Sequence, residues 1–392
     1  MNTTKTGLIL SGGGARAAYQ VGVLKAIVKL LPSKCTNPFD IISGTSAGAI
    51  NGVAMASYAD NHRIGVRHLE RIWGNFECSH IYRTDFIGVS LTLMKLVRSL
   101  VIGRGFKTDP VSLLDNTPLR DLLREVIKFD NIQNNVDNGH LHALAVNCSG
   151  IDSGESVSFF QGHYSLNNWE RLRRKGVRSR ITLQHLMASS AIPMVFPAIK
   201  IHREYYADGA VRQLSPLSPA LHLGAEKILV IGVSGEAHQR ANQNMQSLYP
   251  SPARIMGHML NAAFIDSMAA DVERLRRINR TLDRIPLEIQ RRDKMELRKV
   301  NILEINPSMS LDNLAGQHAA EMPRALKLAL GGSGNTSKSG SGLLSYLLFS
   351  KGYCQALMEL GYHDAMTRSD DILEFFSDHF TQTQPSLTAM GE

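Results

Sequence analysis

Short apolar runs and helical patterns alternate over the first sixty residues. An apolar run at Thr6–Leu10 ends in Ser-Gly-Gly-Gly, which is typical of a buried strand that stops at a tight loop. Apolar residues then recur at helical spacing across residues 15–32 until Pro32 ends the pattern. A second apolar run at Phe39–Ser43 precedes a stretch of small residues, 46–59, that predicts a second helix. This order of strand, loop, helix, strand, turn and helix predicts an α/β protein with a parallel sheet.

The rest of the chain changes character after about residue 237. Further strands are predicted at Ala143–Asn147, Ser156–Phe160 and Lys227–Val233. Arg-rich helical stretches follow, then a Gly/Ser-rich segment that predicts a flexible loop at about 331–342, and then a terminal helix over 343–366. We therefore expect one unit over residues 1–236 and a mainly helical region over residues 237–392.

The composition is that of a soluble globular protein. Of 392 residues, 43% are apolar and 20% are charged, and no uncharged apolar run is long enough to predict a transmembrane helix. The first residues lack the apolar core of a signal peptide, so we expect a cytoplasmic protein, with peripheral attachment to the inner face of the membrane as an option. The four cysteines are widely spaced, which favours buried free thiols over disulfides or a zinc site.

The net charge of +8 is concentrated in a basic cluster over residues 171–180, which holds six cations and no acidic residue. Anionic lipid head groups and nucleic acid are both chemically suited to bind it, and a solvated loop is the alternative. A second basic region over residues 274–299 also holds acids, which predicts a solvated helix. The candidates for membrane contact are Arg171, Arg173, Arg174, Lys175, Arg178 and Arg180.

One long apolar segment leaves two interpretations open. Phe86–Ile102 is apolar except for Lys95 and Arg98. It is consistent with a core helix, or with a segment that touches a membrane or an acyl chain.

A Gly-x-Ser-x-Gly pattern places Ser46 at the centre of a candidate nucleophile elbow. Such an elbow needs a strand before the serine and a helix after it, and both are predicted here. Gly44 and Gly48 would leave room for the sharp turn and for close helix packing. The alternative is an ordinary Gly-Ser loop.

The stretch Ser-Gly-Gly-Gly-Ala-Arg-Ala at residues 11–17 is a candidate oxyanion loop. Consecutive glycines before a helix let backbone N–H groups point into one cavity, and the helix N-terminus favours negative charge. The same stretch fits a dinucleotide fingerprint through Gly12, Gly14 and Ala17. That interpretation is disfavoured, because Asp40 lies at the start of the second strand and not at its end.

The proton acceptor for Ser46 is ambiguous from the residues alone. His222 and His258 follow the serine in the order that a Ser-His-acid triad needs. Asp208 ends an apolar-aromatic run and is followed by Gly209, which places it at a strand end before a glycine turn.

Together, "GGGARA", "GTSAG" and "DGA" resemble, in this order, the motifs of the patatin-like phospholipases. "MASSAIPMVFPAI" at Met187–Ile199 also looks like the segment that precedes the Asp-Gly motif in that family. The resemblance covers Thr6–Gly235. It implies a three-layer fold with a central, mostly parallel sheet flanked by helices, plus a mainly helical C-terminal part.

The resemblance also implies a Ser-Asp dyad without a catalytic histidine. Ser46 matches the nucleophile and Asp208 its general base. The remaining motif positions are the oxyanion loop, Gly12, Gly13, Gly14 and Arg16, and the motif glycines Gly44, Gly48 and Gly209. The family pattern usually ends its glycine loop in glycine, where this chain has Ala17. No metal or organic cofactor is required.

The expected function is therefore a serine lipid acyl hydrolase acting on phospholipids, lysophospholipids or glycerides. A non-catalytic membrane-binding or regulatory protein of the same fold, and a Ser-His-Asp esterase, are the alternatives. The expected partner is a lipid ester, with anionic membrane as a second partner and no nucleic acid. The oligomeric state is open, with a homodimer as one option.

Overall fold

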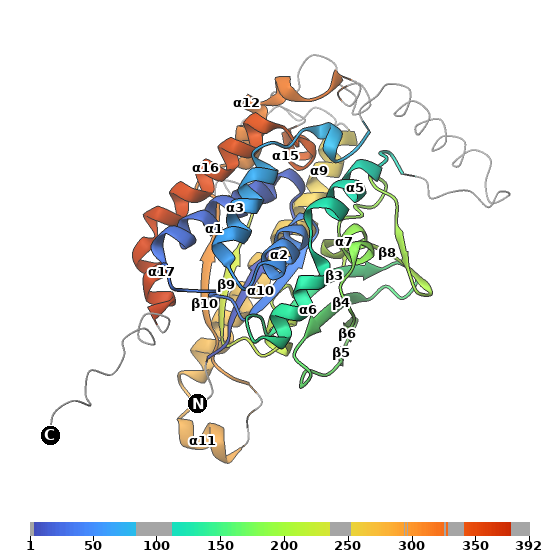
Figure 1. Ribbon diagram of the computed structural model, residues 1–392. Helices are drawn as coiled ribbons and strands as arrows, with labels where there is room; N and C mark the ends of the chain where they lie inside the picture. The colour runs from blue at the N-terminus through green and yellow to red at the C-terminus, as the bar shows by residue number, and fades with distance from the viewer. Residues whose placement is uncertain are drawn as a thin grey trace, which may run out of the picture.

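A single ten-stranded sheet forms the centre of the part of the chain that the structure describes (Figure 1). The computed structural model describes residues 4–83, 112–235, 252–293, 295, 297–324, 327 and 341–377. The strand order is β10-β9-β1-β2-β3-β4-β6-β5, with β8 also paired to β3 and β7 paired to β8. The strands are β1 Thr6–Leu10, β2 Ile41–Thr45, β3 Ala143–Gly150, β4 Ser156–Gly162, β5 Trp169–Arg171, β6 Arg174–Arg178, β7 Ile199–Ile201, β8 Glu204–Asp208, β9 Lys227–Ile231 and β10 Asn301–Ile305.

Five neighbouring strands run parallel to one another: β10, β9, β1, β2 and β3. The remaining pairings include antiparallel ones. Every residue of β1 is buried, because successive side chains point to opposite faces and both faces are covered. Leu8 and Leu10 join the larger apolar core, whereas Ile9 joins the smaller core on the other face. This arrangement explains why the central strands appear in the sequence as continuous apolar runs.

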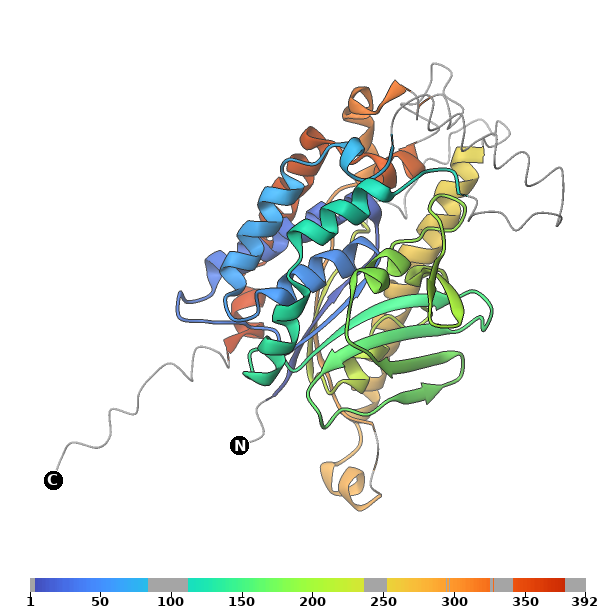
Figure 2. The same ribbon diagram turned by 45° about the vertical axis from the view of Figure 1, so that its right-hand side comes forward.

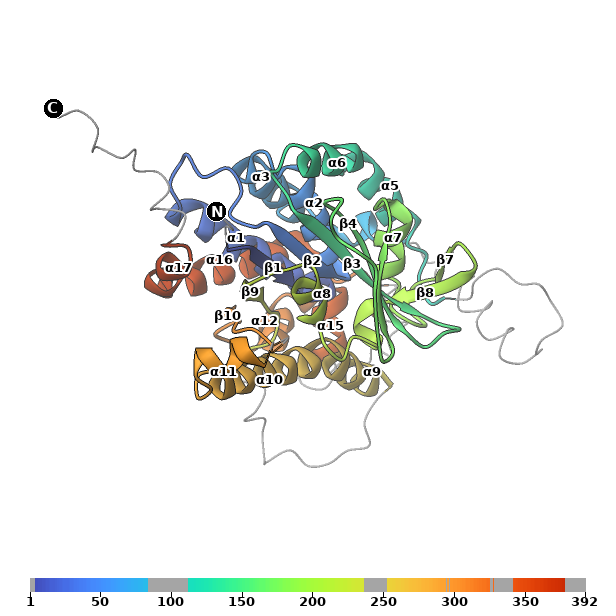
Figure 3. The same ribbon diagram turned by 90° about the horizontal axis from the view of Figure 1, so that it is seen from below.

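Helices cover both faces of the sheet and complete a three-layer fold (Figure 3). Figure 2 shows α9, η5 and α10 running together along the sheet, where Met268, Val272 and Leu275 of α10 pack into the smaller core. The helices are η1 Gly14–Ala17, α1 Ala18–Leu30, α2 Ala47–Ser57, α3 His62–Trp73, η2 Cys78–His80, α5 Thr117–Val126, α6 Phe129–Asp137, α7 Leu183–Ser189, η3 Gly209–Val211, α8 Ser218–His222, α9 Pro252–Asn261, η5 Ala262–Asp266, α10 Ser267–Leu282, α11 Leu287–Arg292, α12 Leu311–Gln317, η6 Ala319–Glu321, α15 Ser341–Leu347, α16 Lys351–Thr367 and α17 Ser369–Phe375.

The predicted α/β class and mostly parallel sheet are confirmed. The first strand lies where it was predicted, and the second begins two residues later than predicted, at Ile41. The helix predicted over 343–366 was wrong as a single element. It is broken between α15 and α16, where Ser350 adopts an extended conformation.

Residues beyond 236 add to the same sheet. β10 pairs with β9, and α16 packs along α1 (Figure 1). The division of the chain at residue 236 stays a prediction. The apolar segment Phe86–Ile102 lies outside the described residues, as does the predicted flexible loop up to residue 340. Within the described ranges, no helix combines the length and apolar character needed to cross a membrane.

Candidate active site

Ser46 lies on a sharp turn between the end of β2 and the start of α2. Its φ of 56° is unusual for a residue with a side chain, and such conformations cost about 1–3 kcal/mol. The neighbouring glycines permit this turn. A Cβ atom at Gly44 would lie 2.5 Å from the Ala49 Cα, and one at Gly48 would lie 2.3 Å from the Leu10 carbonyl oxygen.

The strained turn is held by hydrogen bonds from two other segments. The Ser46 backbone N–H donates to Ser189 Oγ at 2.9 Å, and that hydroxyl donates to the Asn147 carbonyl at 2.6 Å. The Asn147 side chain in turn donates to the Gly44 carbonyl at 2.9 Å. Ser46 is thereby fixed from β3 and α7 as well as from its own strand and helix.

Asp208 lies beside this turn, at the end of β8, and is fully buried. Its Oδ1 accepts a hydrogen bond from the Ala210 N–H at 3.0 Å. Its Oδ2 is buried and makes no hydrogen bond of ordinary geometry with any described residue. Burial raises the pKa of Asp208 to about 7, opposed by interaction with the Ser46 hydroxyl and with the Ala210 N–H. The carboxyl is thus able to take up a proton near neutral pH.

The tripeptide Gly12–Gly14 passes directly beside Ser46. A Cβ atom at Gly12 would lie 3.1 Å from the Ser46 Cβ and 2.4 Å from the Phe264 ring. Gly14 has a φ of 55°, and a Cβ atom there would lie 2.2 Å from the Tyr346 carbonyl oxygen. Gly13 and Gly209 are also enclosed, by Val233 and by the Asn147 backbone respectively. Only glycine allows the loop to pass this close to the serine.

The Arg16 side chain is directed into the C-terminal helices. It is completely buried, and its guanidinium forms an ion pair of 2.6 Å with Asp312. It also donates to Ser345 Oγ at 2.7 Å and lies 4.0 Å from the centre of the Tyr346 ring. These contacts tie the glycine loop to α12 and α15, a connection that the motif alone does not reveal.

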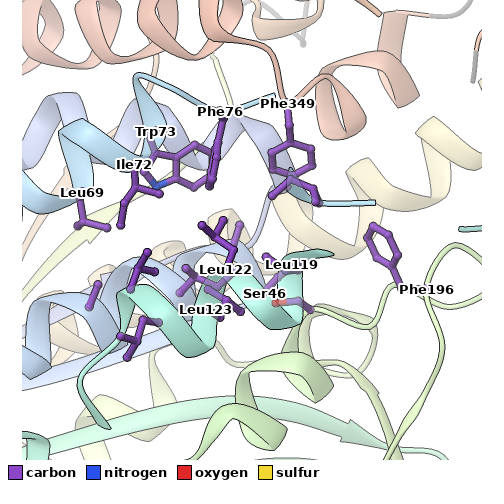
Figure 4. Close-up of a pocket in the computed structure, with 18 of the residues that line it drawn as sticks. Ser46, Leu69, Ile72, Trp73, Phe76, Leu119, Leu122, Leu123, Phe196 and Phe349 are labelled. Atoms are coloured by element: carbon purple, nitrogen blue, oxygen red, sulfur yellow. The ribbon is translucent and has the colours of Figure 1, made fainter. Parts of the chain in front are cut away.

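An apolar pocket extends from Ser46 between helices α2, α3 and α5 (Figure 4). In Figure 4, Ser46 lies near one end of the pocket and Leu69 near the other. Tyr346, Leu347 and Phe349 also line it, so the C-terminal region contributes to this site. The lining is almost entirely apolar, which suits a hydrocarbon ligand.

The two candidate histidines lie elsewhere. His222 stacks on Trp169 with ring centres 5.1 Å apart, and its pKa is lowered to about 4 by burial and then by nearby arginines. His258 is exposed on α9. Neither lines the pocket that contains Ser46. Within the described part of the chain, no three His, Cys, Asp or Glu side chains are grouped as a metal site would need.

The basic cluster at residues 171–180 is built on the strands β5 and β6 and is not a simple loop. Three of its six cations have partners from distant parts of the chain. Lys175 pairs with Glu155, and Arg180 pairs with Asp130 at 2.6 Å. Arg178 donates to backbone carbonyls, among them that of Gly162 at 2.9 Å. The cluster is therefore partly neutralised in three dimensions, although not in the sequence.

Sequence reasoning missed several residues around Ser46. Ser189 and Ser190 belong to the segment Met187–Ile199, which was recognised as a motif without a role for either serine. Phe264 and Tyr346 come from the C-terminal region, where the sequence holds no motif that predicts proximity to Ser46.

Comparison with known proteins gives a match to one family and similarity to several individual proteins. The family model described as patatin-like phospholipase matches residues 8–221. The chain is 31% identical over 115 residues to patatin-like phospholipase domain-containing protein 7 of Rattus norvegicus. This alignment covers 29% of this chain and 8% of that protein. It is 52% identical over 54 residues to lysophospholipase nte1 of Aspergillus terreus, which covers 14% of this chain and 3% of that one. The matched segments are thus small parts of much longer relatives.

Two solved structures are similar to this chain at low identity. Human GIVD cytosolic phospholipase A2 in complex with methyl gamma-linolenyl fluorophosphonate has a TM-score of 0.44 and 13% identity, covering 97% of this chain and 60% of that one. VipD from Legionella pneumophila has a TM-score of 0.36 and 13% identity, and the match covers 94% of this chain and 67% of that one.

Proposed function

Because the chain belongs to the patatin-like phospholipase family, we propose that it is a serine lipid acyl hydrolase with a Ser46–Asp208 dyad. The observation that supports this most is the buried Asp208 carboxyl beside Ser46, at one end of an apolar pocket. The substrates we propose are fatty acyl esters of phospholipids, lysophospholipids or glycerides.

In the first step, Ser46 Oγ attacks the ester carbonyl while Asp208 accepts the serine proton. A carboxyl with a pKa raised to about 7 is a far better base than an exposed aspartate near 4. The negative charge that develops on the carbonyl oxygen would face the N–H groups of Gly12–Gly14, at the start of η1. Each such donor typically contributes about 3–4 kcal/mol of transition-state stabilisation.

In the second step, the protonated Asp208 transfers its proton to the departing alcohol oxygen, leaving an acyl ester on Ser46. Water then attacks the acyl carbon and gives a proton to Asp208. The bond to Ser46 Oγ breaks, the serine regains its proton from Asp208, and the fatty acid leaves. The reaction consumes one water and releases one alcohol and one fatty acid.

The pocket is proposed to hold the acyl chain along α2. Ile50 and Ala54 of this helix line the pocket on the same side as Ser46. Ala54 follows Ser46 by two helical turns, which corresponds to about 12 Å at 1.5 Å per residue. A hydrocarbon chain bound at Ser46 would therefore pass Ala54 only if it is of medium or greater length.

Enlarging Ala54 should therefore shorten the chains that the enzyme accepts. We expect wild-type protein to hydrolyse p-nitrophenyl decanoate and dodecanoate in preference to the butyrate. Ala54→Leu should lower the rate on the dodecanoate by about tenfold or more, because overfilling a packed site costs about 1–3 kcal/mol. The rate on the butyrate should stay within about twofold and serves as the internal control for folding.

Two outcomes would count against the proposal. If Ala54→Leu lowers the hydrolysis rate equally for all chain lengths, the pocket does not hold the acyl chain. Wild-type protein that is inert on every ester, also with phospholipid vesicles present, would favour the non-catalytic alternative.

We further propose that the exposed part of the basic cluster contacts anionic membrane. Arg171 and Arg173 are exposed, and Arg173 occupies the turn between β5 and β6. Replacing both with glutamine should weaken binding to phosphatidylserine-containing vesicles at low salt by about tenfold, since each cation near such a surface contributes about 1 kcal/mol. Vesicle sedimentation measures this effect.

The charge-matched control for this experiment lies on α10. Arg277 and Arg280 are exposed there, and their replacement with glutamine removes the same charge from a different surface. If both double variants lose binding equally, only net charge matters, and the proposed contact at β5 and β6 is wrong.

A further inference from the structure

Residues 189–191 connect both members of the proposed dyad. Ser189 Oγ accepts a hydrogen bond from the Ser46 N–H at 2.9 Å. The Ala191 carbonyl accepts one from the Asp208 N–H at 2.9 Å. Ser190 lies between these two contacts, so its backbone is held relative to both residues by the hydrogen bonds of its neighbours.

The Ser190 hydroxyl belongs to the same pocket as Ser46. Ser190 is 6% exposed and lines the pocket, and its Oγ has no hydrogen-bond partner among the residues that the structure describes. A buried hydroxyl without a partner is unfavourable and rare, so it needs an explanation.

Two other polar side chains of the pocket wall, Trp73 and Tyr346, have partners. The indole N–H of Trp73 donates to Asn51 at 2.8 Å, and the Tyr346 hydroxyl donates to Asn261 at 2.8 Å. Ser190 thus differs from these two in presenting a hydroxyl that no atom of the described residues hydrogen-bonds. Asp208 Oδ2 is a second buried oxygen with no hydrogen bond of ordinary geometry among the described residues, and its carboxyl also interacts with the Ser46 hydroxyl.

We propose that Ser190 is a catalytic residue that holds the hydrolytic water during breakdown of the acyl-enzyme. This inference rests on the proposed function. A buried water needs two or more polar partners, and a hydroxyl can both donate and accept. Ser190 Oγ and Asp208 Oδ2 would supply these partners beside the acyl carbon on Ser46.

The roles of the two groups in this step are different. The water oxygen forms a bond to the acyl carbon and gives its proton to Asp208, while the bond from that carbon to Ser46 Oγ breaks. Ser190 orients the water by a hydrogen bond and neither gains nor loses a proton overall. It therefore acts only after the alcohol has left, because acylation involves no water.

This timing makes the proposal testable with Ser190→Ala. With p-nitrophenyl dodecanoate, kcat should fall by about tenfold or more, the loss expected for one hydrogen bond to a reacting group. KM should fall in parallel, so that kcat/KM, which reports acylation, stays within about twofold. Intact-mass analysis during turnover should show acyl-enzyme accumulating in this variant.

Two further variants separate this role from a structural one. Ser190→Thr keeps the hydroxyl and should recover most of the lost kcat. Ser57→Ala removes another buried hydroxyl, which donates to the Ala54 carbonyl at 2.8 Å, and it should show no accumulation of acyl-enzyme.

Other results would overturn the assignment. If kcat and kcat/KM fall equally and no acyl-enzyme accumulates, Ser190 acts during acylation, by contacting the ester or its oxyanion. Unchanged kinetics would deny it any catalytic role. Failure of the proposed function looks different: the wild-type protein would then hydrolyse no ester, and Ser190→Ala would carry no acyl adduct on Ser46.

Discussion

Replacing Ser46 with alanine, or Asp208 with asparagine, should abolish ester hydrolysis and leave the fold intact. Loss of a nucleophile from a catalytic unit lowers kcat by about 10⁶ in comparable serine enzymes, and loss of a general base lowers it by about 10²–10⁴. Both side chains are buried and isosteric changes leave no large cavity, so circular dichroism should be unchanged. Initial rates with p-nitrophenyl dodecanoate measure the effect.

The pH dependence of the wild-type enzyme should identify Asp208 as the base. Burial raises the pKa of its carboxyl to about 7, so the active, deprotonated form is populated only above that pH. We expect kcat/KM to rise with pH through about 7 and then to level off. The residual activity of Asp208→Asn should lack this rise.

The same pKa has a consequence for stability. The unfolded carboxyl ionises near pH 4, whereas the folded one keeps its proton up to about pH 7. The unfolded state thus binds fewer protons over this interval, and the contribution of Asp208 to the free energy of unfolding falls as the pH rises from about 4 to 7. At pH 8, Asp208→Asn should be at least as stable as the wild type in urea denaturation.

A matched control for Asp208 lies on the other side of the sheet. Asp271 is 6% exposed, accepts a hydrogen bond from the Leu217 N–H at 2.9 Å, and has a pKa that is also raised by burial. Asp271→Asn should retain activity. Full activity in Asp208→Asn, or in Ser46→Ala, would refute the dyad and reopen the search for a nucleophile or base.

Removing Asp312 should destabilise the protein by about 3 kcal/mol. Its partner Arg16 is completely buried, and an uncompensated buried charge typically costs about 3–5 kcal/mol. The ion pair joins η1, next to the glycine loop, to α12 in the C-terminal region. We therefore expect Asp312→Ala to lower both the urea midpoint and the rate of ester hydrolysis.

The expected loss of stability depends on the burial of Arg16. An ion pair with an exposed arginine is therefore a suitable control. Arg276 pairs with Glu304 at 3.1 Å, but its side chain is 53% exposed. Arg276→Gln should therefore cost less than about 1 kcal/mol. In a double-mutant cycle, Arg16→Met with Asp312→Ala should cost less than the sum of the single changes. Additive losses would show that the two side chains act independently.

The sequence by itself determined the elements whose causes are local. The strands β1 and β9 are apolar after their first residues, Thr6 and Lys227, because both faces of a parallel sheet are covered, and this is visible without a structure. The turn at Ser46 is likewise predictable, because Gly44 and Gly48 mark a strand-turn-helix junction in the sequence. For the same reason, Asp208 could be placed at a strand end before a glycine.

Tertiary structure decided which groups meet across long separations in the chain. It surrounds the Arg16 guanidinium with Asp312, Ser345 and Tyr346, about 300 residues away in sequence, although the motif suggested only a loop residue. It places Ser190 in the same pocket as Ser46 and leaves its hydroxyl without a partner in the described part of the chain. Burial and charge pairing depend on packing in three dimensions, so spacing along the chain could not reveal them.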